Sequence, residues 1–94
     1  MGIASVTFGT ADPARSVFRG LPRVSENLDG SSSSAATTGT ARLGEIARIC
    51  VQSAAWVTVG DSPTASAGTS YYLPAGGELH LEMAEGHKVA VLEA

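Results

Sequence analysis

The run ELHLEM at residues 78–83 constrains the fold of this chain more than any other segment. Every second position is leucine or methionine, and the positions between are charged or histidine. Alternation with a period of two is typical of a β-strand with one buried and one solvated face. Turn sequences that end in Gly76 and Gly86 flank the run, and glycine accepts the positive φ that closes such turns. Residues 71–92 are therefore predicted to form three strands joined by two tight turns, an antiparallel meander.

Other segments repeat this strand signal. In IARICVQ, alternate residues Ala47, Ile49 and Val51 are apolar and are predicted to face a core, with Arg48 on the opposite face. The further predicted strands are residues 3–8, at a sheet edge, residues 24–28 and residues 56–59. Short strands separated by turn signals every eight to twelve residues predict an all-β fold, a small antiparallel β-sandwich or jelly-roll-like domain.

The 94 residues leave room for one structural domain. Residues 42–94 are predicted to form its antiparallel β core. Residues 1–41 are predicted to hold an N-terminal strand, an extended and partly irregular arm, and a serine-rich loop.

Within this N-terminal part, a helix over residues 9–23 is disfavoured by Gly20 and Pro22, although one helical turn after Pro13 is compatible with the sequence. Residues 31–34 of the run SSSSAATTGTA are expected to be a loop. The following AATT could also pair as an edge strand with another chain.

Composition indicates a thin core. Hydrophobic residues make up 44% of the chain, but alanine dominates them and aromatic residues reach only 5%. Small side chains contribute little burial energy, which indicates either a flat, thin sandwich or a core completed against neighbouring subunits in a homo-oligomer. The lone Cys50 excludes an internal disulfide and is expected to be a small buried residue, which suits synthesis in a reducing cytoplasm.

Charge and hydropathy limit the classes of partner that this protein is expected to bind. The net charge of −3 argues against a general nucleic-acid-binding protein. No run approaches the roughly 18 apolar residues of a membrane span. Charge is uneven along the chain, since five of the six basic residues precede residue 49 and five of the nine acidic residues follow it.

Two groups of residues suggest chemistry. Gly60-Asp61-Ser62 is similar to the nucleophile block of one esterase class, but the chain lacks the α/β scaffold and the acid–histidine pair that this chemistry needs, so an enzyme is not expected. Glu78, His80 and Glu82 share a strand face, and His87 follows the next turn. A divalent metal is conceivable there, but a solvated sheet face is the favoured interpretation and no cofactor is expected.

The aromatic residues suggest binding instead. Trp56 with Tyr71 or Tyr72 could form a carbohydrate-stacking surface, although the two tyrosines must face opposite sides of a strand. A sole tryptophan more often anchors a core or an interface, which is the favoured interpretation.

The second half of the chain contains a series of strand and turn motifs: ARICV at 47–51, WVTVG at 56–60, SPTA at 62–65, YLPAG at 72–76 and GHKVAV at 86–91. With these motifs, residues 42–93 resemble small virion structural proteins of tailed bacteriophages. The resemblance implies a β-sandwich present in many copies in the virion, most simply a capsid decoration (cement) protein bound to the major capsid protein, with a trimer as one possible assembly. A tail, head-fibre or head–tail connector component is the first alternative. A small glycan-binding module is the second.

Overall fold

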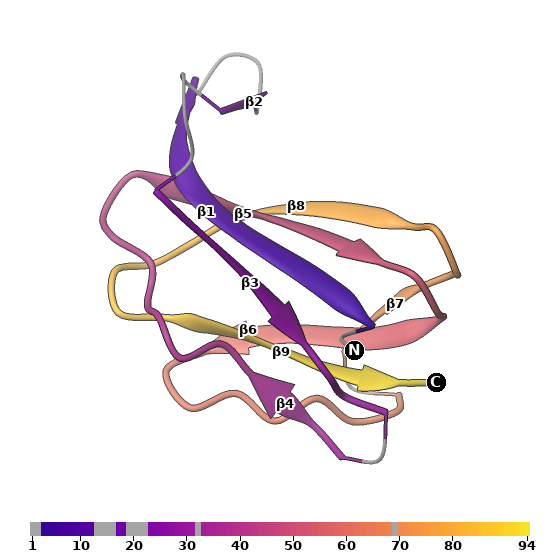
Figure 1. Cartoon of the computed structure of the whole chain (residues 1–94). Coiled ribbons are helices and arrows are strands. Elements are labelled where there is room, and N and C mark those ends of the chain that lie inside the picture. Colours follow the sequence, from indigo (N-terminus) through magenta and orange to yellow (C-terminus); the bar gives the residue numbers. More distant parts are fainter. Residues whose placement is uncertain (1–2, 13–16, 19–22, 32, 69) are drawn as a thin grey trace.

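The computed structural model describes residues 3–12, 17–18, 23–31, 33–68 and 70–94 of the chain. Among these residues all regular structure is β-strand, and the strands form two antiparallel sheets stacked as layers (Figure 1). The predicted all-β, sandwich-like fold is confirmed. The jelly-roll topology is not.

The first sheet places a long strand at its centre. β1 pairs with β3 on one side and with β5 on the other, so that Val6 lies opposite both Glu26 and Ile49. The prediction of a short edge strand at residues 3–8 is therefore wrong. The proline at 13 restricts its predecessor to extended backbone, which a strand satisfies, and β1 continues through Gly9 to Asp12. The strands of this sheet are β1 (Ala4–Asp12), β2 (Val17–Phe18), β3 (Val24–Leu28), β5 (Glu45–Val51) and β8 (Glu78–Glu82).

The second sheet has the order β4-β9-β6-β7. Its strands are β4 (Ala35–Ala36), β6 (Ala55–Gly60), β7 (Tyr71–Leu73) and β9 (Lys88–Glu93). The sequence allowed Ala35 and Ala36 to pair with another chain. In the structure they pair with β9 of the same chain, and Ala35 lies opposite Val91. Both sheets thus include strands from the N-terminal and the C-terminal part of the sequence.

The predicted meander over residues 71–92 is wrong in its pairing, although its three strands and two turns exist. Gly76 and Gly86 both have positive φ, 78° and 84°. However, β7 and β9 belong to the second sheet and β8 to the first, so each turn carries the chain from one layer to the other. Alternation specifies which face of a strand is turned to the core, not which strand lies beside it, and the alternate layering still turns the apolar face of each strand towards the core.

The hydrophobic core lies between the sheets and is built largely from small and β-branched residues. Its largest side chain is Phe8 on β1, which is fully buried. Ala47, Ile49 and Val51 face it from β5 as predicted, and Leu79 and Leu81 pack against it from β8. Other fully buried side chains are those of Ile49, Val6, Val57, Val89, Val91 and Thr37.

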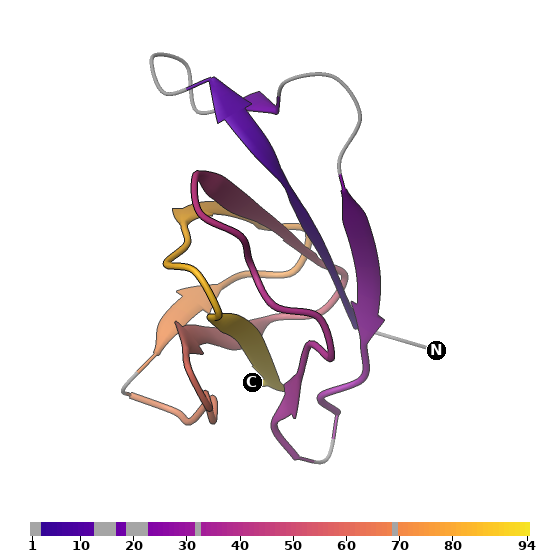
Figure 2. The same cartoon turned by 90° about the vertical axis from the view of Figure 1, so that its left-hand side faces the viewer.

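The end of β1 projects beyond the sandwich. Its last two residues pair with β2, Ala11 opposite Phe18 and Asp12 opposite Val17. Figures 1 and 2 show β2 and the end of β1 standing clear of the other strands. The chain thus has an N-terminal arm, but part of it is a strand rather than irregular. The predicted helical turn after Pro13 lies outside the described residues.

Gly30 marks a close approach between the layers. It follows β3, and its carbonyl oxygen accepts a hydrogen bond of 2.9 Å from the N–H of Glu93 in β9. A Cβ at this position would lie 2.5 Å from the Val91 carbonyl oxygen. Only glycine lets the two backbones meet here, which explains the turn pair Asp29-Gly30.

Candidate functional site

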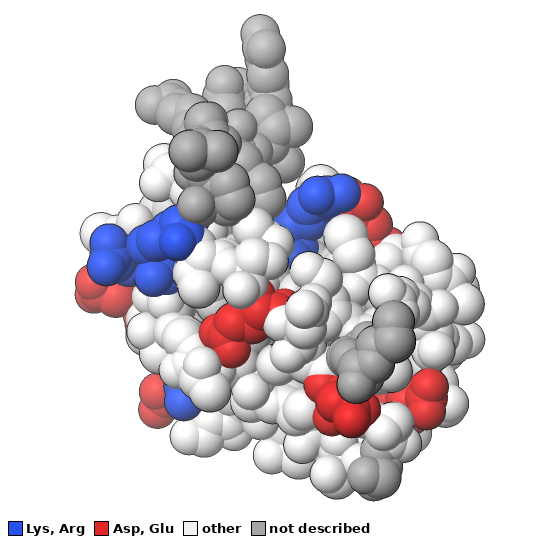
Figure 3. Space-filling model, viewed as in Figure 1, with Lys and Arg blue, Asp and Glu red and all other residues white. Residues whose placement is uncertain are grey.

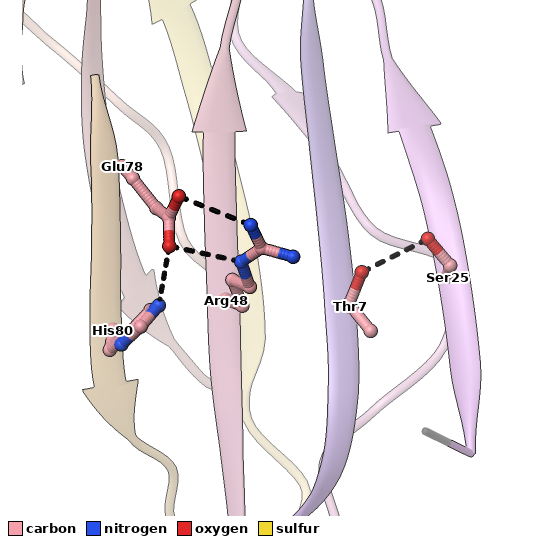
Figure 4. A network of polar contacts seen from close by, with 5 residues as sticks. All are labelled: Thr7, Ser25, Arg48, Glu78 and His80. Carbon is pink, nitrogen blue, oxygen red and sulfur yellow. Dashed lines mark hydrogen bonds and ion pairs between the residues drawn. The ribbon is translucent and has the colours of Figure 1, made fainter. Parts of the chain in front are cut away.

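The outer face of the first sheet is polar and charged. Arg48 on β5 donates from Nε and Nη2 to the two carboxylate oxygens of Glu78 on β8, at 3.0 and 3.1 Å. His80 Nε2 lies 2.9 Å from Glu78 Oε1. Further along the same face, the hydroxyls of Thr7 and Ser25 lie 3.1 Å apart (Figure 4). The pairing of β5 with β8 places Arg48 opposite His80, which brings these groups together.

This arrangement is that of an ion-pair network rather than a metal site. The Arg48 guanidinium and then His80 lower the pKa of Glu78 to about 2. The Glu78 oxygens that could bind a cation already accept hydrogen bonds from these two neighbours. His87 lies apart from them, before β9. Within the described residues, no group of three or more His, Cys, Asp or Glu side chains is placed to hold a metal ion.

Cys50 lies on this same outer face, half-buried and opposite Ser5 and Glu78. The expectation of a buried core residue is therefore only partly met. Arg48, as predicted, shares its face.

The outer face of the second sheet is aromatic and uncharged at its centre. Leu92, Trp56 and Tyr72 are direct neighbours across β9, β6 and β7, and they point away from the core. The Trp56 and Tyr72 rings meet edge to face, with centroids 5.2 Å apart and an interplanar angle of 64°. We call these three residues the aromatic face. Tyr72 is 52% exposed, whereas Trp56 and Leu92 are half-buried.

Tyr71 points to the opposite side of β7 from Tyr72, as the sequence predicted, because it lies opposite the buried Val57. It is nevertheless 56% exposed, since β7 is the last strand of its sheet. Only one of the two tyrosines therefore belongs to the aromatic face.

The connection between β6 and β7 crosses the outer face of the second sheet. It leaves β6 at Gly60 and reaches the β4 side, where the Ala65 N–H donates to Ser34 Oγ at 2.9 Å, before it returns to β7 at the other edge. The outward-facing Ala90 on β9 is fully buried. The aromatic face is what remains open beside this connection.

Asp61 and Ser62 lie exposed in the bend after β6. Lys88 pairs with Gly60, so His87 is at the same end of the second sheet. No hydrogen bond or ion pair links His87 to Asp61 or Ser62, although all three are described residues. The bend therefore shows none of the mutual contacts of a nucleophile with its base.

A second ion pair, which the sequence did not reveal, joins the start of β3 to β5. Arg23 Nε and Nη2 donate to the two oxygens of Glu45, both at 2.8 Å, and Nη2 also donates to the Thr40 carbonyl at 2.7 Å. The Arg42 N–H donates to Glu45 Oε1 at 2.7 Å. The Glu45 side chain is only 4% exposed. The two partners are 22 residues apart in the sequence, so no local sequence pattern predicts this ion pair.

Glu26 on β3 forms hydrogen bonds with the segment that follows β4. Its carboxylate accepts hydrogen bonds from the N–H and hydroxyl of Thr38, both at 3.0 Å, and from the Gly39 N–H at 2.9 Å. Burial alone would raise the pKa of Glu26, but these donors outweigh it and the pKa is lowered. The carboxylate thus holds β3 against the segment that follows β4.

Acidification should therefore destabilise the fold. Hydrogen bonding by Arg23 lowers the pKa of Glu45, and the pKa values of Glu26 and Glu78 are also lowered from 4.5. Between that value and the folded-state values the unfolded chain binds more protons, so stability increases with pH there. We expect the free energy of unfolding to be constant above about pH 5 and to fall as pH drops towards 2. Urea denaturation at a series of pH values checks this, and Glu78→Gln should reduce the slope. A stability independent of pH across this interval would contradict it.

The surface charge in the view of Figure 3 is unevenly distributed. Lysine and arginine lie mainly at the left and top, with acidic residues directly beside them, and further acidic residues lie at the centre and lower right. Within the described part of the chain, no helix is long and apolar enough to cross a membrane. Comparison of the chain with models of known protein families, with curated proteins and with solved structures finds no match.

Proposed function

We propose that this chain is a structural protein of a bacteriophage virion, most simply a capsid decoration protein that binds the major capsid protein and stabilises the head lattice. The sequence motifs over residues 42–93 supply the resemblance that suggests this role. On this proposal the chain is made in the host cytoplasm, acts in the virion as a homo-oligomer such as a trimer, and needs no cofactor.

One observation carries the proposal: the two outer faces of the sandwich differ in kind. The first sheet presents Arg48, Glu78 and His80 to solvent, whereas the second presents Leu92, Trp56 and Tyr72 without a charge among them. Aromatic side chains on an otherwise small domain are typical of the buried centre of a protein interface. A subunit that contributes one such face to a lattice needs no reaction centre, which agrees with an entirely structural role.

The same face supports a second candidate, a small glycan-binding module, because sugar rings stack on exposed aromatic rings. Trp56 is half-buried and Tyr72 meets it edge to face, so a flat stacking platform is not preformed. We therefore place this function second. A glycan-array signal that Trp56→Ala abolishes would favour it.

A tail, head-fibre or connector role would use the same face but in few copies per particle. Electron microscopy of labelled particles would distinguish this role from decoration of the head.

Tyr72 and its neighbour Tyr71 offer a matched test of the docking face. Both are about half exposed, but only Tyr72 contacts Trp56. Tyr72→Ser should weaken binding to particles of the encoding phage about tenfold or more, because an interface aromatic typically contributes ~2 kcal/mol or more. Tyr71→Ser should change binding only slightly. Co-sedimentation over a concentration series measures both. Equal effects of the two substitutions would contradict the proposed docking face.

A further inference from the structure

One edge of β8 has backbone groups without a partner among the described strands. The hydrogen bonds from Met83 N–H to Glu45 O, 3.2 Å, and from Val51 N–H to Gly77 O, 3.1 Å, show that odd-numbered positions along β8 direct their backbone polar groups towards β5. Backbone groups alternate sides along a strand. The N–H and C=O groups of Glu78, His80 and Glu82 therefore point away from the sheet. Among the described strands β8 pairs with β5 alone, so these groups lie along an open edge.

The other sheet edges are less available. β4 and β7, the outer strands of the second sheet, contain only two and three residues. Beside β3, Glu26 holds Thr38 and Gly39, and Arg23 holds the Thr40 carbonyl. β8 offers five residues, and no contact of this kind from the described part of the chain ties another segment to its outer side. An open strand edge of this length is a template for an added strand.

Side chains along this edge specify the chemistry of the added strand. Glu78, His80 and Glu82 share the outer face, and Glu82 is exposed and forms no ion pair with another described residue. On the inner face, Leu79 and Leu81 are only half-buried, because β8 ends the sheet. A strand that places a basic residue beside Glu82 and apolar residues beside the leucines would complement both faces.

The same charges disfavour pairing of β8 with a second copy of itself. An antiparallel pair centred on His80 would place each Glu78 opposite the partner's Glu82, and like charges directly opposite are destabilising. The acidic edge thus discriminates between partners through repulsion of its own kind and attraction of cationic strands.

We propose that the edge of β8 binds an extended segment of another protein in which basic and apolar residues alternate, by addition of a strand to the first sheet. The recognition combines backbone hydrogen bonds to Glu78, His80 and Glu82 with an ion pair to Glu82, because Arg48 and His80 already occupy the Glu78 carboxylate. This site lies on the sheet opposite the aromatic face and does not depend on the proposed function.

A pair of substitutions at His80 tests the backbone contribution. Proline at this position removes an N–H that points out of the sheet, which an edge strand tolerates, and leaves the ladder to β5 intact. His80→Ala removes the same side chain but keeps the N–H. The probe is the capped peptide Ala-Arg-Val-Ser-Val-Arg-Ala, which can place an arginine beside Glu82, with Ala-Glu-Val-Ser-Val-Glu-Ala as its control.

Calorimetry with the full chain should show that wild type and His80→Ala bind the arginine peptide, that His80→Pro binds it at least tenfold more weakly, and that the glutamate peptide does not bind. Amide hydrogen exchange at residues 78, 80 and 82 should slow with the arginine peptide. Should His80→Pro fail to fold, Glu82→Lys serves instead, with reversed preference between the peptides. Equal affinity for both peptides, equal binding by both His80 variants, or self-association through β8 would overturn the proposal. Peptide binding without particle binding would leave this site standing and refute only the virion role.

Discussion

Phe8→Ala is expected to lower the free energy of unfolding by about 3–5 kcal/mol, the range for removal of a fully buried aromatic ring. Phe8 is the largest side chain of the core and is completely inaccessible to solvent. It lies on the central strand of the first sheet, opposite Val24 and Ala47, so the cavity would open between both layers. Small domains have about 5–15 kcal/mol of stability in total, and this core has few other large side chains. Urea denaturation followed by circular dichroism measures the loss.

Thr7→Ala is the matched control, since Thr7 is the preceding residue on β1 and faces the other way. Among the described residues its hydroxyl is hydrogen-bonded to Ser25 alone, on the exposed face, so the expected loss is about 0.5–1 kcal/mol. If β1 were an edge strand with a half-exposed phenylalanine, the two substitutions would have similar effects. Similar effects would therefore contradict the central position of β1.

Arg23→Ala is expected to cost about 2–4 kcal/mol, because it leaves the carboxylate of Glu45 buried without its cation. Glu45 is 4% exposed and would keep only the hydrogen bond from the Arg42 N–H. Arg23 itself is 28% exposed, so water can partly replace it and the lower part of the range is favoured. Arg23→Lys should recover part of the loss, because a lysine supplies the charge but not the two-pronged hydrogen bonding. Thermal unfolding near neutral pH checks the order of the three proteins.

Arg48→Ala provides the comparison. Arg48 also contacts both oxygens of a glutamate, but the two side chains are 47% and 43% exposed. Exposed ion pairs contribute little, so its loss should be clearly smaller than that of Arg23→Ala. If the two arginine substitutions proved equal, burial of Glu45 would not be what makes the Arg23 pair stabilising.

The sequence was most informative about which face of each strand is buried. The alternation in 46–52 and 78–83 correctly assigned the inward side chains, and the positive φ of Gly76 and Gly86 followed from the turn pattern. These properties depend on a few neighbouring residues. Local patterns therefore sufficed to predict them.

Partner choice between strands was not predictable in the same way. The run 71–92 reads as a meander, yet its strands alternate between layers, because pairing is decided by contacts with β5 and β6 elsewhere in the chain. The Arg23–Glu45 pair likewise depends on two segments that meet only after folding. The aromatic face was half predicted: the separation of Tyr71 from Tyr72 followed from alternation, but the contact of Tyr72 with Trp56 needed the register of β6 and β7.

The proposed virion role makes the outer aromatic face, not a reaction centre, the reason for the shape of this domain. The two proposed docking sites then bind chemically different surfaces. The face of Leu92, Trp56 and Tyr72 would contact an apolar surface, whereas the edge of β8 would receive a cationic strand. Together they would let one small sandwich contact two neighbours in a lattice.

The most direct test of the proposed capsid decoration role is the copy number of this chain in purified particles of the encoding phage. The same test compares the thermal stability of heads with and without the chain. A decoration protein is predicted to co-sediment with heads in a fixed ratio to the major capsid protein. Adding the purified chain to heads that lack it should raise their melting temperature. Absence of the chain from sedimented particles would contradict the account.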